Sequence, residues 1–185
     1  MSLFIAPVEI KNQELIDKII EETQRSFNIN SSAIKLNFNT DQLYSEERKQ
    51  YFSTGFITQA IEQTQNIDGK ILIVTELDLY VPVLTFLFGE AQLHGKHSIV
   101  SFCRLHEEFY SENENKSLFY ERALKEVFHE LGHNYGLIHC HDWDCVMHSS
   151  NSVEEVDIKG FYYCGNCASK VEKQNGIKLR RYFGH

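Results

Sequence analysis

The sequence has few prolines, no long apolar run and fewer basic than acidic side chains, and each shortage narrows its class. With two prolines and 42% hydrophobic residues, the chain has the composition of an ordinary globular protein rather than of a proline-rich disordered one. No run reaches the roughly 18 apolar residues of a membrane span, so we expect no membrane partner. The start of the chain lacks the basic region and the small-residue cleavage site of a signal peptide, which favours a cytoplasmic protein.

Positive charge is also scarce. The 18 Lys and Arg residues stand against 26 Asp and Glu residues, and the net charge is −8. Nucleic acids and anionic membranes are bound through clustered positive charge, so we expect neither as a partner. A zinc ribbon that binds nucleic acid is disfavoured for the same reason.

The apolar pattern predicts one domain in which strands and helices alternate. A chain of 185 residues can bury a core without further support. The patterns predict strands over residues 3–8, 33–38 and 70–77, helices over 12–27 and 45–65, and a hairpin within 83–103. The predicted fold class is α/β (α+β), with a mostly parallel twisted sheet, an antiparallel edge strand and covering helices.

A further helix, predicted to start near Ser117, runs into the stretch HELGHNYGLIHCHDWDCVM, which begins at His129. His129 and His133 are four residues apart and therefore share one face of this helix. Gly136 permits the left-handed turn that ends a helix, and the chain can then bring His139 back to the same point. Three histidines that leave one coordination position for water form an open zinc site of the catalytic kind.

Glu130 follows His129 in the sequence and is rotated from it by about 100° around the helix. It is therefore poorly placed as a ligand and well placed beside a zinc-bound water. Zinc acidifies such a water and polarises a substrate carbonyl group. Glu130 is then the general base that takes the proton and passes it to the leaving amine. The pattern predicts a zinc metallopeptidase that hydrolyses peptide bonds without a covalent intermediate.

Four of the five cysteines form two spaced pairs, Cys140 with Cys145 and Cys164 with Cys167. Such pairs, separated by a loop, are typical of a structural zinc site with four thiolate ligands. We therefore expect two zinc ions, one catalytic and one structural, and the second would stabilise a C-terminal part with few apolar residues. Two alternatives stay open. Two disulfides would need an oxidising compartment, and a redox-active CGNC motif would need a βαβ setting.

The combined pattern H-E-x-x-H-x-x-G-x-x-H-C-x4-C-x-M with a closing C-x2-C resembles the archaemetzincin family of metzincin zinc peptidases. Residues 75–93 and 151–160 resemble that family as well. The resemblance implies a compact metzincin-like zincin fold and one zinc on each of the two ligand sets. It also implies a Met-turn in which Met147 forms the floor beneath the catalytic zinc.

We expect a single peptidase domain over residues 1–185, with an N-terminal subdomain (1–136) and a small zinc-stapled C-terminal subdomain (137–185). It would act as a monomer on a peptide or protein substrate. The alternative is a metzincin-fold protein whose site is silent or occluded and which serves as a zinc-dependent binding module. The presence of Glu130 favours the enzyme, whereas a cleft filled by the protein's own side chains would favour the module.

Several residues near the motif are not predicted to be functional. His141 and His148 flank it, and we expect them to be loop residues because the ligand positions are already filled. Tyr162 and Tyr163 are expected to pack as an aromatic pair beside Cys164 rather than reach the catalytic zinc. Cys103 is expected to be a buried thiol.

Overall fold

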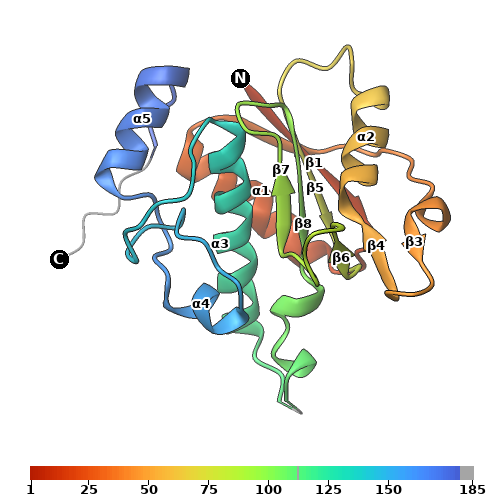
Figure 1. The fold of residues 1–185 in the computed structure, drawn as a ribbon. Helices are drawn as coiled ribbons and strands as arrows, with labels where there is room; N and C mark the ends of the chain where they lie inside the picture. The colour runs from red at the N-terminus through yellow and green to blue at the C-terminus, as the bar shows by residue number, and fades with distance from the viewer. Residues whose placement is uncertain (112, 180–185) are drawn as a thin grey trace.

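The structure is a computed structural model that describes residues 1–111 and 113–179 of the chain (Figure 1). The strands and helices are β1 (Ser2–Val8), α1 (Gln13–Phe27), β2 (Asn30–Ala33), β3 (Tyr44–Ser45), β4 (Gln50–Phe52), α2 (Ser53–Gln63), β5 (Lys70–Thr75), β6 (Leu79–Tyr80), β7 (Gly89–Ala91), β8 (His97–Ser101), α3 (Lys116–Asn134), α4 (Val153–Ile158) and α5 (Gly165–Asn175), with 3₁₀ turns at Thr40–Leu43, Cys103–Leu105 and Glu107–Phe109.

Five strands form the main sheet in the order β2-β1-β5-β8-β7. The first four run parallel to their neighbours, whereas β7 is antiparallel to β8 and lies at the edge. This arrangement confirms the predicted fold class. The edge strand lies beside α3, the helix that carries the histidine motif (Figure 1). The predicted hairpin therefore places a free strand edge next to the motif.

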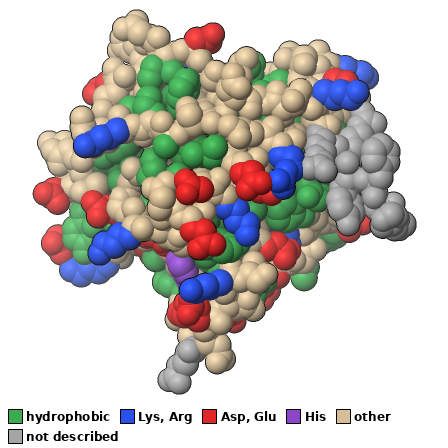
Figure 2. Space-filling model, turned by 180° about the vertical axis from the view of Figure 1, so that it is seen from behind, with side chains coloured by type: hydrophobic (Ala, Val, Ile, Leu, Met, Phe, Trp, Pro, Cys, Tyr) green, Lys and Arg blue, Asp and Glu red, His purple; other side chains and the backbone are tan. Residues whose placement is uncertain are grey.

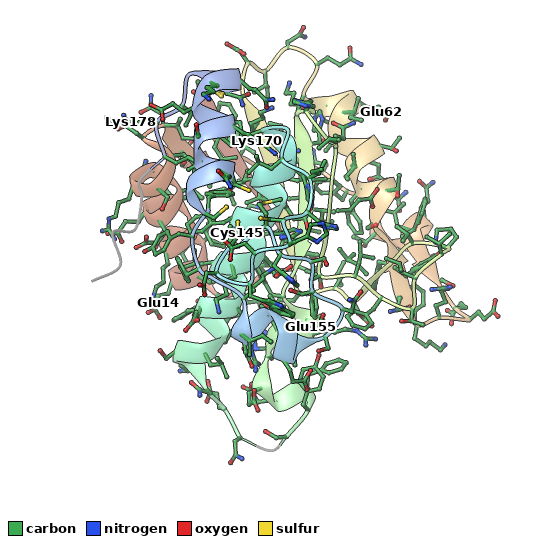
Figure 3. All side chains as sticks on the ribbon, turned by 60° about the vertical axis from the view of Figure 1, so that its left-hand side comes forward. Glu14, Glu62, Cys145, Glu155, Lys170 and Lys178 are labelled. Atoms are coloured by element: carbon green, nitrogen blue, oxygen red, sulfur yellow. The ribbon has the colours of Figure 1, made fainter. Side chains whose placement is uncertain are left out.

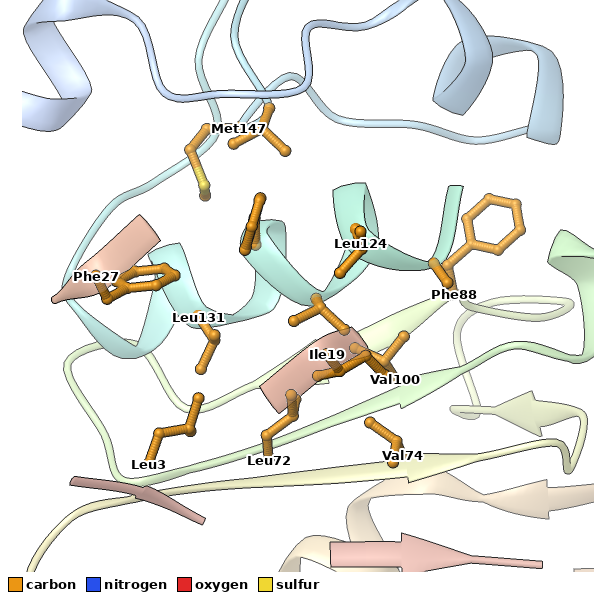
Figure 4. Close-up of a cluster of buried hydrophobic side chains, with 14 of the residues drawn as sticks. Leu3, Ile19, Phe27, Leu72, Val74, Phe88, Val100, Leu124, Leu131 and Met147 are labelled. Atoms are coloured by element: carbon orange, nitrogen blue, oxygen red, sulfur yellow. The ribbon is translucent and has the colours of Figure 1, made fainter. Parts of the chain in front are cut away.

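Successive side chains of the inner strands point to opposite faces of the sheet. Leu72 and Val74 pack with α1 and α3, whereas Ile73 packs with α2. Figure 4 shows Leu72 and Val74 on one side of α3 and Met147 on the other side. A parallel strand that is covered on both faces needs apolar residues at every position, which explains the unbroken apolar run in β5.

The predicted strand over residues 33–38 is wrong beyond Ala33, where β2 ends. Ile34 still bonds β1, but from Asn37 onward the backbone hydrogen bonds go to side chains of α2 instead of another strand. The backbone N–H and C=O of Asn37 bond the amide of Gln63 at 2.9 and 2.8 Å. Those of Asn39 bond the amide of Gln59 at 2.9 and 3.4 Å. Two glutamines one helical turn apart thus take the place of a neighbouring strand.

The predicted helix over residues 45–65 is wrong in its first part, because α2 begins only at Ser53. The preceding residues form a short hairpin, β3 with β4, to which β6 adds a third strand. Lys49 has a φ of +57°, a left-handed conformation that turns the chain between the two strands. The rings of Tyr44 and Tyr51 face each other across the hairpin, with centroids 5.0 Å apart. This aromatic pair favours strand pairing over helix.

The chain beyond Gly136 packs against the side of α3 that faces away from the sheet (Figure 4). It forms loops, the short helix α4 and the C-terminal helix α5. Val146, Val156 and Val171 from this part join the same apolar core as the sheet. α4 has no counterpart among the predicted elements.

On the face shown in Figure 2, acidic and basic side chains of the described residues are interspersed. Among the described residues, no helix is both long enough and apolar enough to cross a membrane.

Candidate metal centres and the cleft between them and the sheet

The helix α3 fixes the first two histidines of the motif. It begins with Asn115, whose side chain accepts a hydrogen bond from the backbone N–H of Leu118. It ends at Asn134, and Gly136 follows with a φ of +91°. The N–H of Leu137 then bonds the C=O of Gly132 at 2.9 Å. The glycine thus reverses the chain as predicted, because few other residues adopt this φ without strain.

The structure brings His129, His133 and His139 together, with one ring nitrogen of each within 4.8 Å of the others. Nδ1 of His129 bonds the C=O of Val146 at 2.9 Å, and Nδ1 of His133 bonds the C=O of Leu137 at 2.7 Å. A backbone carbonyl can only accept, so each Nδ1 carries the proton and each Nε2 keeps a free lone pair. Burial lowers the pKa of His129 and of His133, which favours this neutral form.

These lone pairs converge on one point. Nε2 of His129 lies 3.1 Å from Nε2 of His133. Two unprotonated nitrogens at this separation repel each other unless a proton or a cation lies between them. Three imidazoles, two of which have their second nitrogen held by a carbonyl group, are the donor set and outer hydrogen-bonding shell that zinc prefers. The residues present therefore fit a zinc ion.

Met147 is fully buried against α3. It follows Val146, whose carbonyl group bonds Nδ1 of His129. A Cβ atom on Gly132 would lie only 2.3 Å from the Met147 sulfur and 3.0 Å from the ring of Tyr163. The glycine therefore leaves the space in which the methionine sits against the helix. Tyr163 donates its hydroxyl hydrogen bond to the C=O of Phe128, which confirms that it packs here rather than facing the histidines.

An open cleft of about 610 Å³ runs between the β7 side of the sheet and the histidine cluster. Its lining includes Glu126, Glu130 and the three histidines of the motif. Burial raises the pKa of the Glu130 carboxyl well above its usual range, and the charge of Glu126 raises it further, whereas Lys159 opposes both. His139 is exposed, so the cluster is accessible from the cleft. The described side chains do not fill this space.

Lys159 and Glu126 form an ion pair beside the cleft, with Nζ 2.7 Å from Oε1. Both side chains are almost fully buried. Oε1 of Glu126 makes no hydrogen bond of good geometry. The two groups therefore interact as an ion pair through their opposite charges. No local pattern in the sequence pointed to this pair, because the two residues are 33 positions apart.

The four paired cysteines form a second cluster, and their sulfur atoms lie within 4.8 Å of one another. Figure 3 shows Cys145 between α3 and α5, with other sulfur atoms close by. The pKa of the Cys145 thiol is lowered to about 5, first by a hydrogen bond from Cys167 and then by backbone N–H groups, against the effect of burial. A thiolate is the form that binds metal, so this set also fits zinc.

The disulfide alternative finds no support. All five are free thiols, and the sulfur atoms of Cys140 and Cys164 are 3.9 Å apart, well beyond a covalent bond. Cys103 stands apart from the cluster and is only half-buried, and burial raises its pKa to about 11. His148 stacks on Trp143 with ring centroids 3.7 Å apart and is not in either cluster, as expected.

The β7–β8 hairpin is tied to the end of α3 by residues that the sequence did not single out. Asn134 donates from its side chain to the C=O of Gln92 at 3.1 Å and to that of His97 at 3.0 Å. The N–H of His94 bonds the C=O of His133 at 3.0 Å. Lys70 donates to the C=O of Asn134 at 2.8 Å. These bonds fix the distance between the edge strand and the histidines.

The site combines two histidines on one helix with a third that follows a glycine turn, beside a mostly parallel sheet with an antiparallel edge strand. This combination defines a zinc peptidase of the metzincin type. The chain belongs to peptidase family M54, the family of the archaemetzincins, whose model matches residues 14–173. The protein is therefore a zinc metallopeptidase, and it acts on peptide or protein substrates.

Comparisons of sequence and structure agree. The archaemetzincin of Methanocaldococcus jannaschii is 38% identical over 172 residues, which cover 93% of each chain. The crystal structure of the archaemetzincin of Archaeoglobus fulgidus, complexed with malonate, superposes with a TM-score of 0.78 at 33% identity, covering 92% of this chain and 99% of that one. A zinc-dependent peptidase from Methanocorpusculum labreanum gives a TM-score of 0.80 at 26% identity, covering 91% of this chain and 99% of that one.

Proposed function

We propose that His129, His133 and His139 hold the catalytic zinc and that Glu130 is the general base in peptide-bond hydrolysis. The observation that carries this proposal is the convergence of three imidazole nitrogens at the wall of an open cleft that Glu130 also lines. Second nitrogens that are hydrogen-bonded to backbone carbonyls would keep at least two of the rings aimed at the metal.

The chain's own groups supply the proton transfers. When bound, zinc polarises the substrate carbonyl and acidifies the attacking water. Glu130 accepts one proton from that water while the oxygen attacks the carbonyl carbon. Glu130 then gives this proton to the nitrogen of the leaving amine as the C–N bond breaks, so the carboxylate is restored at the end of each cycle. Met147 would support the ligands from below, in the manner of a Met-turn.

The substrate would lie along β7. This strand pairs with β8 on one side only, and its other side borders the cleft. A free strand edge can hydrogen-bond an extended peptide through its backbone, which is a common mode of peptide binding. Such binding would bring a peptide bond to the histidine cluster without a requirement for one particular side chain.

We further propose a second, structural zinc on Cys140, Cys145, Cys164 and Cys167, which makes two zinc ions per chain. Four thiolates leave no position for water, so this site would have no part in catalysis. It would close the C-terminal subdomain (137–185) onto the N-terminal subdomain (1–136). Cys164 and Cys167 flank the start of α5, and Cys140 directly follows the proposed ligand His139. Neighbouring residues would thus serve different metals.

Peptide cleavage by wild type and Glu130→Gln tests the catalytic proposal. A peptide library read by mass spectrometry samples many sequences at once, so no single substrate has to be chosen. We expect the variant to keep its zinc and to lose turnover by a factor on the order of 10² to 10⁴, the usual contribution of a general base. Glu62→Gln, an exposed site on α2, is the matched control and should behave as wild type.

The same experiment separates the enzyme from a silent binding module. A module would bind peptides from the library and cleave none of them. An open cleft and an accessible His139 favour the enzyme. Full activity of Glu130→Gln would instead show that a different group is the base.

A further inference from the structure

Gly89, the first residue of β7, lies directly against the carboxyl group of Glu130 in the lining of the cleft. A Cβ atom at this position would lie 2.5 Å from Oε1, 2.6 Å from Cγ and 2.7 Å from Cδ of Glu130. Non-bonded carbon and oxygen atoms do not approach so closely, because contact begins at about 3.5 Å. The space that Glu130 occupies therefore exists because residue 89 has no side chain.

The backbone gives no other reason for a glycine here. Among the described residues, the glycines with a left-handed φ are Gly69, Gly136 and Gly176, and Gly89 is not one of them. Residue 89 lies in an ordinary strand, paired with Val100, where most residues are preferred to glycine. Clearance for Glu130 is the feature that distinguishes this position.

Glu130 depends on this packing for its position. Its side chain is 5% exposed, and among the described residues its carboxyl group is influenced by burial and by nearby charges rather than by a hydrogen bond. The ring of His129, by contrast, is fixed by a hydrogen bond to Val146. A buried carboxylate without a hydrogen-bond anchor keeps its rotamer through steric contact alone, so the surface of β7 at Gly89 sets where it points.

We infer that Gly89 is a positioning residue for the general base, and this inference rests on the proposed role of Glu130. A side chain at position 89 would clash with the flexible side chain of Glu130 and not with backbone atoms. The Glu130 side chain can move to relieve the clash without unfolding the protein. The movement would, however, carry the carboxylate away from the water that it must deprotonate. Catalysis should suffer more than stability.

The first test compares kcat and KM for zinc-loaded wild type and Gly89→Ala. We expect kcat to fall by a factor on the order of 10 to 100, the effect of misplacing a catalytic group by about 1 Å. Zinc content and KM should stay unchanged. The control is Gly55→Ala in α2, where a Cβ would lie 2.3 Å from the end of the Leu43 side chain. This substitution also produces a clash with a flexible side chain, but away from the cleft, so it should leave kcat unchanged.

The second test does not depend on activity. The thermal midpoint of the zinc-loaded protein is measured for Gly89→Ala, alone and combined with Glu130→Ala. Alone, the substitution should lower the midpoint, because a buried carboxylate is displaced. Combined, Cγ, Cδ and Oε1 of Glu130 are gone, so the same substitution should leave the midpoint unchanged or raise it, since alanine restricts the unfolded chain. A purely local strain in β7 would lower the midpoint equally in both backgrounds.

The outcomes separate this inference from the proposed function. If Glu130→Gln is inactive and Gly89→Ala has the wild-type kcat, the general base stands and the role of Gly89 is wrong. A raised KM with unchanged kcat would also overturn it, because the glycine would then serve the approach of the substrate. If Glu130→Gln is fully active, the proposed function fails, and the inference that rests on it fails too. Should Gly89→Ala fail to fold alone, folding in the Glu130→Ala background would support the clash, and failure there would refute it.

Discussion

The sheet-and-helix region (residues 1–136) and the loop region (residues 137–179) are stabilised by different forces. The first buries apolar strands between helices, so its stability comes from packing and from backbone hydrogen bonds. The second contains only two helices, and α3 holds it through charged groups as well as apolar contacts. Arg122 binds Asp157 at 2.6 Å, and both side chains lie where α3 meets α4. The four cysteines then link the ends of the loop region.

The two ligand clusters reflect this difference. The histidine cluster is built on α3 and needs accurate positions more than binding energy, because two ligands and the base share one rigid helix. The cysteine cluster joins a loop to the start of α5 with four side chains from two separate segments, so its metal would contribute folding free energy directly. Loss of the first should therefore abolish activity, whereas loss of the second should unfold one region.

The largest effect is expected from Cys145→Ser. Structural zinc sites contribute roughly 10–16 kcal/mol in small zinc-binding peptides, more than the stability of many whole domains. The variant should bind one zinc fewer, and residues 137–179 should lose protection in hydrogen exchange followed by mass spectrometry, while the central sheet keeps it. Cys103→Ser, outside the cluster, is the control. Unchanged protection in the loop region would show that packing alone holds it.

The next largest effect is expected from Lys159→Met, which removes one partner of the buried pair with Glu126. The remaining carboxylate would be buried without a counter-charge, at a cost of about 3–5 kcal/mol in the free energy of unfolding. Urea unfolding of the zinc-loaded protein measures it. Adding Glu126→Gln should recover much of the loss, because no charge then remains. The exposed Lys170→Met is the control. A loss no larger than that of the control would mean that the pair does not join the two regions.

A smaller effect is expected from Asn134→Ala, which acts within the first region. Asn134 is 1% exposed and donates to two carbonyls of the β7–β8 hairpin. Each carbonyl keeps one backbone hydrogen bond, that of Gln92 from Gly95 and that of His97 from Gln92, so losing the second bond should cost about 0.5–1.5 kcal/mol. Hydrogen exchange should increase in residues 92–97 and stay unchanged in the loop region. Asn66→Ala, at an exposed position, is the control. An equal increase in hydrogen exchange in both regions would contradict the prediction that the two regions are stabilised independently.

The sequence predicted those features that depend on local spacing. The apolar runs of β1 and β5, the helix through the motif and the turn at Gly136 all follow from periodicity or from one conformational requirement. The same holds for the histidine and cysteine clusters, because their spacing along the chain already places the ligands on one face or at the two ends of a loop. Most of the candidate site was therefore accessible from the sequence.

The features that escaped prediction depend on partners that are distant in sequence. The segment after Ala33 is not a strand, because two glutamine side chains 20 and 26 residues away take its hydrogen bonds. The pairing of Lys159 with Glu126 and the contact of Gly89 with Glu130 leave no local pattern either. Neither a lysine in a loop nor a glycine in a strand names its partner, and only the fold shows what each one faces.

The smallest effect concerns a titrating pair in the first region, away from both clusters. Nε2 of His106 lies 2.9 Å from a carboxylate oxygen of Glu76, and this hydrogen bond raises the pKa of His106, with smaller contributions from Glu108 and Glu114 and an opposing one from burial. A raised folded-state pKa stabilises the protonated form. The pair should therefore contribute fully below the unfolded-state pKa of about 6.5 and lose its contribution as pH rises through the higher folded-state value.

The pair is partly exposed, so its contribution should be less than about 1 kcal/mol and should weaken with salt. The free energy of unfolding of wild type minus that of His106→Gln, measured from pH 6 to pH 9, should fall with rising pH. His97 serves as an internal comparison, because burial lowers its pKa to about 4 and it stays neutral over this whole range. The unfolded chain still takes up a proton on His97 near pH 6.5, so the difference for His97→Gln should rise from pH 6 to about pH 8 and then level off, opposite to the trend for His106. A difference for His106 that is constant or grows with pH would show that the bond to Glu76 does not stabilise the charged ring. Hydrogen-exchange protection of the loop region should be the same in both variants as in wild type. The attachment of that region depends on the cysteines and on Lys159 rather than on His106 or His97.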